Sequence, residues 1–127
     1  MRVVLAALAL YHGANGALML AAPELWYSIV PDVDHTGPLN VHFVRDIGLA
    51  FIAAAAGLAI AALSFKNSVA MWPAAIFLAG HAGLHITEMG VHGAAPLAAA
   101  RDVATIVLPG LLPLFLLSLP WKKEVRS

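Results

Sequence analysis

The chain has 127 residues, of which 61% are hydrophobic and 11% are charged, and its formal net charge is zero. Soluble domains carry about 25% charged residues, and small ones keep much of their surface in water, so this composition excludes an ordinary soluble domain and indicates a protein of the lipid bilayer. The zero net charge argues against a nucleic-acid partner, and the absence of cysteine excludes disulfides and thiol chemistry.

Four segments are long and apolar enough to cross a bilayer, which takes about 20 residues of helix. They run from about residue 3 to 22, 39 to 63, 69 to 92 and 97 to 119. Residues 23–38 contain three prolines, residues 65–68 are a short polar turn, and residues 90–96 are a third break. We therefore predict an all-α fold, a single four-helix transmembrane bundle with antiparallel neighbours.

Lysine and arginine are unevenly distributed between the two ends of this predicted bundle. Those on one side are Arg2, Lys66, Lys122, Lys123 and Arg126. The connections on the other side contain Glu24, Asp32 and Asp34 but no lysine or arginine. The positive-inside rule then places both termini in the cytoplasm. The first apolar stretch is longer than the core of a signal peptide, so we expect it to be the first span.

Two patterns recur in the two halves of the chain. His12 in the first predicted span and His81 in the third are flanked by glycine and alanine, and the pairs Arg45-Asp46 and Arg101-Asp102 lie in the second and fourth. Each half is thus a histidine helix followed by an Arg-Asp helix. The pattern fits two duplicated helical hairpins, and it equally fits chance recurrence of small residues.

Four polar residues of the third predicted span share one helix face, namely His81, His85, Glu88 and His92. Their spacing of four, three and four residues places them within an arc of about 60°. Such spacing is typical of a seam that faces the interior of a bundle. We expect this stripe to line one cavity that opens outward, with His12 and Asp46 on the facing walls.

The remaining intramembrane charges can neutralise one another. Ionisable side chains inside a span usually face the bundle interior and pair. We therefore predict that Arg45, Asp46, Arg101 and Asp102 are buried and form the reciprocal structural ion pairs Arg45–Asp102 and Arg101–Asp46. Glu88 is then left over, and it must be protonated, hydrogen-bonded to a histidine or bound to a cation.

Several functions remain open for these residues, and no catalytic motif assigns an enzymatic activity. Imidazole and carboxylate groups could bind a transition metal. His12 and His81 could be the axial ligands of haem b. The cluster could also be a pocket for a quinone-like ligand, or a proton relay. The alternative is a non-catalytic accessory subunit, packed against other membrane subunits or against copies of itself, in which the polar cluster only determines packing.

One stretch of the first half resembles a known family. It comprises Pro23-Glu24-Leu25-Trp26-Tyr27, Thr36-Gly37-Pro38-Leu39-Asn40 and the segment from His42 to Gly48. This stretch resembles small uncharacterised bacterial four-helix membrane proteins of the DoxX-like kind. The resemblance implies a bacterial inner-membrane location. Because some DoxX relatives are subunits of thiosulfate:quinone oxidoreductases, it also implies a quinone as a candidate ligand, by analogy of fold only.

Overall fold

The computed structural model describes residues 1–64 and 69–119, and these residues are 88% helical with no strand. The all-α prediction is therefore confirmed. The predicted polar turn at residues 65–68 and the basic residues Lys122, Lys123 and Arg126 lie outside the described residues.

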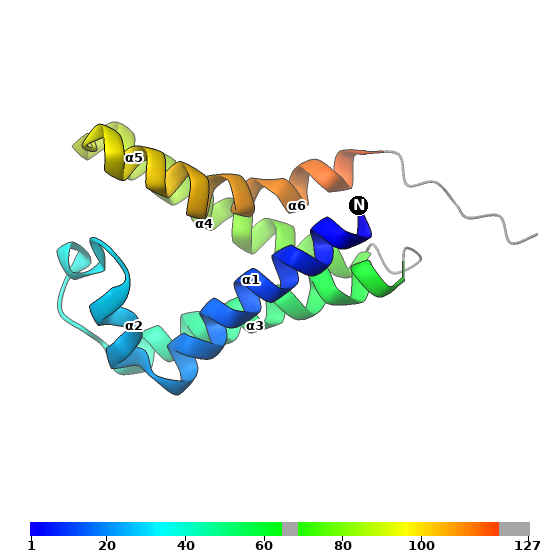
Figure 1. Cartoon of the computed structure of the whole chain (residues 1–127), viewed down its shortest axis with the longest axis horizontal. Coiled ribbons are helices and arrows are strands. Elements are labelled where there is room, and N and C mark those ends of the chain that lie inside the picture. The colour runs from blue at the N-terminus through cyan, green and yellow to red at the C-terminus, as the bar shows by residue number, and fades with distance from the viewer. Residues whose placement is uncertain (65–68, 120–127) are drawn as a thin grey trace, which may run out of the picture.

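Four long helical segments account for most of the described residues (Figure 1). The first three are α1 (Arg2–Ala21), α3 (Val41–Leu63) and α4 (Met71–His92). The last is a continuous segment made of α5 (Pro96–Asp102), the π-helical turn η3 (Val103–Val107) and α6 (Leu108–Ser118). The bounds of these segments lie within two residues of those expected from the apolar stretches.

The connection between α1 and α3 is more regular than the sequence suggested. Its prolines predicted an irregular segment, but it contains the short helix α2 (Pro23–Ile29) and the 3₁₀ turn η1 (Val33–Thr36). Pro23 lies in the first turn of α2, where the missing N–H of a proline costs no helical hydrogen bond. Asn40 then caps α3, because its side chain accepts a hydrogen bond from the backbone N–H of Phe43.

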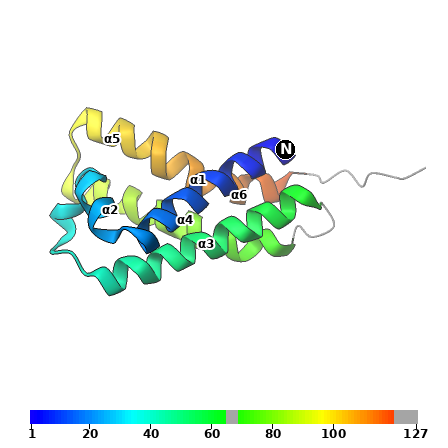
Figure 2. The ribbon, with the colours of Figure 1, turned by 60° about the horizontal axis from the view of Figure 1, so that its bottom comes forward.

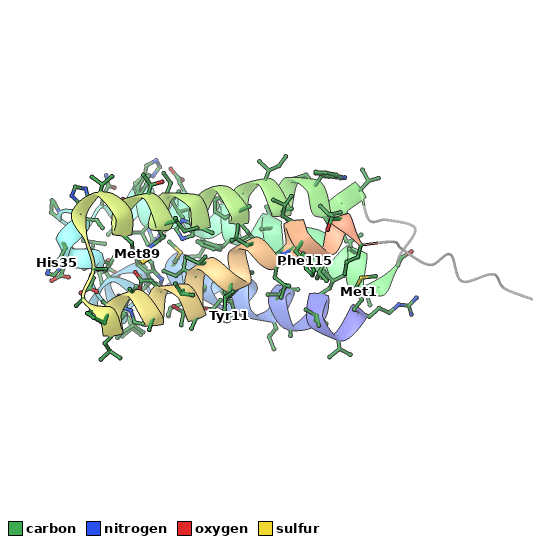
Figure 3. All side chains as sticks on the ribbon, turned by 90° about the horizontal axis from the view of Figure 1, so that it is seen from above. Met1, Tyr11, His35, Met89 and Phe115 are labelled. Carbon is green, nitrogen blue, oxygen red and sulfur yellow. The ribbon has the colours of Figure 1, made fainter. Side chains whose placement is uncertain are left out.

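The segments pack as two hairpins (Figure 2), which lie together near Met1 and diverge toward the end that carries α2 (Figure 1). One hairpin is α1 against α3, the other is α4 against α6, and α3 joins the two by packing on α4. Their shared core is apolar, with Leu5, Leu58, Met71 and Leu78 almost completely buried. We refer to the end of the molecule that carries α2 and η1 as the α2 end; Met1 lies at the opposite end (Figure 3).

Glycine brings the helix backbones into close contact in each hairpin. A Cβ atom added to Gly16 of α1 would lie 2.6 Å from the carbonyl oxygen of Gly48 in α3. In the second hairpin, a Cβ atom at Gly110 would lie 2.8 Å from the carbonyl oxygen of Leu78. Small residues at such crossings are the usual means by which helices approach closely in membranes.

Three of the helical segments are long and apolar enough to cross a membrane, namely α1, α3 and residues 96–118. This finding supports a membrane protein. The 22 residues of α4 are also long enough, but α4 is not among the three because its histidines and Glu88 lower its mean hydropathy. Length and composition thus support three of the four expected spans.

Candidate functional site: a file of imidazoles and carboxylates

His12 occupies the middle of α1 and is the one buried polar side chain among the described residues, with 4% of its surface exposed. Its ring stacks on Phe51 of α3, with centroids 5.8 Å apart and an interplanar angle of 15°. The backbone carbonyl of Pro109 faces the ring, yet Nε2 has no hydrogen-bond partner within the described part of the chain. A buried polar atom without a partner is unusual and often marks a functional position.

Phe51 connects His12 to the histidines of α4. The ring of His81 meets Phe51 edge to face at 5.5 Å, and His85 meets His81 edge to face at 4.9 Å between centroids. Both α4 histidines are half-buried. Of the four residues on the predicted α4 face, His81 thus contacts Phe51 of α3, and His85 contacts His81 on the same helix.

The row of polar side chains continues from α4 to α5 through charged groups. Nδ1 of His85 lies 3.8 Å from a carboxylate oxygen of Asp102. Arg101 donates to the other oxygen of Asp102 through both Nε, at 2.9 Å, and Nη2, at 2.7 Å. Nη2 of Arg101 also donates to Asp32 at 2.7 Å, across to the loop at the α2 end. The polar chain thus runs from His81 in the middle of the molecule to an exposed loop.

Asp32 should release Arg101 only in strong acid. The hydrogen bond from Arg101 is the largest influence on this exposed carboxyl, and it holds the pKa of Asp32 below its ordinary value of 3.8. A lowered folded pKa stabilises the folded loop above the unfolded pKa, and this contribution is lost as the pH falls through the folded value. We expect a carbon-13 titration of Asp32 to show a midpoint below 3.8. The same titration in Arg101→Ala should return to the ordinary value, and an unchanged midpoint would contradict the pairing.

Two prolines of α6 leave backbone carbonyls free on the side that faces α1. A helical carbonyl at position i accepts from the N–H at i+4, and proline has no N–H. At the α-helical spacing, Pro109 therefore has no N–H for the carbonyl of Thr105, and Pro113 has none for the carbonyl of Pro109. The hydroxyl of Tyr11 donates to the carbonyl of Thr105 at 2.7 Å, at the junction of the two hairpins (Figure 3).

Tyr11→Phe should therefore destabilise the protein by about 1–2 kcal/mol, because it leaves the Thr105 carbonyl without a donor. Pro109→Ala restores an N–H to the helix, and in that background the loss of the Tyr11 hydroxyl should cost much less. The measurement is a double-mutant cycle of unfolding free energies in mixed micelles. Additive effects would show that the hydroxyl and the proline act independently.

Several residues that we expected in the site do not belong to this row of polar side chains. Glu88 and His92 are exposed on the last turns of α4. Asp46 is exposed and pairs with His42 on its own helix at 3.3 Å. The expected cavity with Asp46 on its wall is therefore not formed by these residues. The described structure has a shallow groove along α1 and a pocket beneath the α2-end loop, and neither is lined by the α4 histidines.

The predicted reciprocal ion pairs are wrong. Arg101 pairs with Asp102 and Asp32, and within residues 1–64 and 69–119 no ion pair joins Arg45 to Asp102 or Arg101 to Asp46. Arg45 is exposed and donates through Nε to the carbonyl of Leu20 at 3.3 Å. The physical reason is that α3 packs on α1 and α4 and not on α5, so Arg45 and Asp46 do not lie on the side of α3 that could reach Arg101 and Asp102.

The donor set does not fit the metal or haem interpretation. In the described segments no three histidine, aspartate or glutamate side chains lie close enough to hold one metal ion. The two histidines expected to ligate a haem both contact Phe51. Because Phe51 is 6% exposed and packed in the core, its ring fills space that a macrocycle between these imidazoles would need.

The sequence interpretation missed five residues of the site: Tyr11, Asp32, Phe51, Thr105 and Pro109. The prolines offered a signal that could have been used, because Pro109 and Pro113 are four residues apart and so free two carbonyls on one helix face. Asp32 offered no such signal in the sequence, because it lies in a loop and is far from Arg101 along the chain.

Comparison with known proteins gives no relative for this chain. No family model, no curated protein and no solved structure matches it. Its function must therefore be inferred from its own residues.

Proposed function

We propose that the chain is a four-helix transmembrane bundle of the bacterial inner membrane, with both termini cytoplasmic, that passes protons between its outer side and the middle of the bilayer. The α2 end would face outward in this orientation, because its loops carry carboxylates and no lysine. The observation that carries the proposal is the succession of His81, His85 and Asp102, with 4.9 Å between the two ring centroids and 3.8 Å from the His85 imidazole to the Asp102 carboxylate.

The chemistry of these side chains suits proton transfer. A neutral imidazole accepts a proton on one nitrogen and donates one from the other, so adjacent imidazoles can hand protons along a row. Asp102 lies at the outer end of the row, and Arg101 orients its carboxylate by donating to one of its oxygens. His12 lies beyond Phe51, which carries no titratable group and so separates this deepest imidazole from the row.

Within the described residues, the row does not continue toward the Met1 end. The core there consists of apolar side chains such as Leu5, Leu8 and Leu116. A proton that enters from the α2 end must therefore be taken up by a ligand or partner near the middle of the bilayer. A quinone-like ligand has the required chemistry, because a quinone takes up two protons when it receives two electrons, which a separate redox subunit of the membrane would have to supply.

A second candidate is an accessory subunit in a larger membrane complex. The observation that favours it is again that the row ends inside the bilayer. Such a relay is useful only if a neighbouring subunit receives the proton. In this version His81, His85 and Asp102 supply protons to a site on another subunit.

Nitrogen-15 NMR of the histidines in lipid nanodiscs tests the relay. We expect the His81 and His85 signals to respond to external pH and to exchange their ring protons with solvent. Asp102→Asn should slow the exchange at His81 by roughly tenfold, which corresponds to about 1.4 kcal/mol of barrier. Asp34→Asn is the matched control, because Asp34 lies on the exposed turn η1, and it should leave the exchange unchanged.

Two results would contradict the proposal. Equal exchange at His81 in wild type and Asp102→Asn would show that Asp102 is not the entrance to the row. A Soret band, or a stoichiometric metal in elemental analysis of the purified protein, would replace the relay by a bound cofactor.

A further inference from the structure

The outward face of α3 carries an unusual combination of residues for a helix that crosses a membrane. The exposed residues along this face, which we name the α3 stripe, are His42, Asp46, Leu49, Ala53, Ala56, Ile60 and Leu63. Their spacing alternates between four and three residues over the whole helix. This is the heptad pattern by which one helix packs lengthwise against another.

Nothing in the described chain covers this stripe. α3 packs on α1 and α4 with its other side, and toward the α2 end it forms the lower edge of the molecule in Figure 2. Lipid could cover Leu49, Ile60 and Leu63 at no cost. The charges are different, because exposing an ionisable side chain to hydrocarbon is unfavourable.

Arg45 and Asp46 lie on opposite sides of His42 at the start of the stripe. At about 100° per residue, Arg45 lies about 60° to one side of His42 and Asp46 lies about 40° to the other. They also lie at nearly the same depth, because adjacent residues differ by about 1.5 Å along the axis. Arg45 has no carboxylate partner among the described residues, and Asp46 has only the exposed His42.

We propose that a second copy of this chain docks on the α3 stripe and forms a two-fold symmetric dimer. Copies inserted in one orientation share a two-fold axis along the membrane normal, so their α3 helices pack in parallel. Under this symmetry, the side of α3 that carries Arg45 in one copy faces the side that carries Asp46 in the other. Arg45 of each copy then faces Asp46 of its partner, which gives two reciprocal ion pairs. The patch is thus complementary to itself.

The absence of cysteine makes a clean test possible in native membranes. We expect Ala53→Cys, in the middle of the stripe, to form a disulfide-linked dimer on mild oxidation. Leu84→Cys is the matched control, because Leu84 is 64% exposed on α4 and lies outside the stripe. Cross-linking that is equal at the two positions, or absent at position 53, would overturn the proposal.

Variants that exchange the charges of Arg45 and Asp46 test the reciprocal ion pairs separately from the exposure of the stripe. In the Ala53→Cys background, Arg45→Asp or Asp46→Arg alone should lower the cross-linked fraction by about tenfold, because two attractive pairs become repulsive. The double variant Arg45→Asp with Asp46→Arg should restore it. A double variant as defective as either single one would show that lipid head groups, and not a second copy, occupy these charges.

Discussion

Gly16→Ala should be among the most damaging small substitutions in this protein. The added Cβ would lie 2.6 Å from the carbonyl oxygen of Gly48 and 3.0 Å from Cβ of Phe51. A backbone carbonyl inside a helix cannot rotate away, so α1 and α3 must separate. We expect a loss of about 1–3 kcal/mol in the free energy of unfolding, measured in mixed micelles.

Gly83→Ala is the control for this experiment. No atom lies within 4 Å of a Cβ atom placed at Gly83, and alanine has a higher helix propensity by up to about 1 kcal/mol. The control should therefore be neutral or slightly stabilising. If both substitutions destabilise equally, the close approach of Gly16 to Gly48 does not determine the stability of the hairpin.

Arg101→Ala should have the second large effect, because it removes the cation shared by two carboxylates. The side chain of Asp102 is only 18% exposed, and without Arg101 its charge lacks the donors that stabilise it. We expect a loss of about 1–3 kcal/mol, which is less than for a fully buried pair because the site is partly exposed. The loop that carries Asp32 should also detach from α5 and lose protection from hydrogen exchange.

Arg101→Lys separates the charge of this residue from its shape. The guanidinium reaches Asp102 through two nitrogens while it also bonds Asp32. An ammonium group keeps the charge but not this planar fork, so stability should be restored only in part. Full restoration would show that charge alone matters. The control is Glu24→Gln, which removes a charge at the exposed first turn of α2 and should change stability by less than about 0.5 kcal/mol.

The sequence was sufficient to locate the long helices but not to pair their charges. Apolar length and helix-breaking residues are local signals, and they placed each helix within two residues of its observed ends. Ion pairing depends instead on how closely two backbones approach. When the two halves are aligned on His12 and His81, Gly16 takes the place of His85. A glycine there brings α1 against α3 and leaves Asp46 outside, whereas a histidine in α4 faces Asp102.

The α4 seam was predicted only in part, for a related reason. Helical spacing places four residues on one face, but it does not reveal how far along that face a neighbour packs. The packing against α6 and η3 covers α4 at Leu78 and Ala82, and Glu88 and His92 lie beyond it near the end of the helix. Their exposure thus follows from the position at which the neighbouring segment diverges.

The π-helical turn η3 has a consequence for how this site could be altered. In η3 the N–H of Leu108 bonds the carbonyl of Val103, five residues earlier, so the turn holds one residue more than an α-helical turn. In this turn the N–H five residues on takes the place that the N–H four residues on has in an α-helix, so the turn absorbs one extra residue without changing the phase of α5 relative to α6. Deleting one residue from the turn should therefore let the segment continue as a regular α-helix with Asp102 still facing His85. If all the residues 96–118 instead formed one regular α-helix, Asp102 would rotate by about 100° relative to α6 and swing away from His85. The widened turn is thus what keeps the carboxylate aimed at the imidazole.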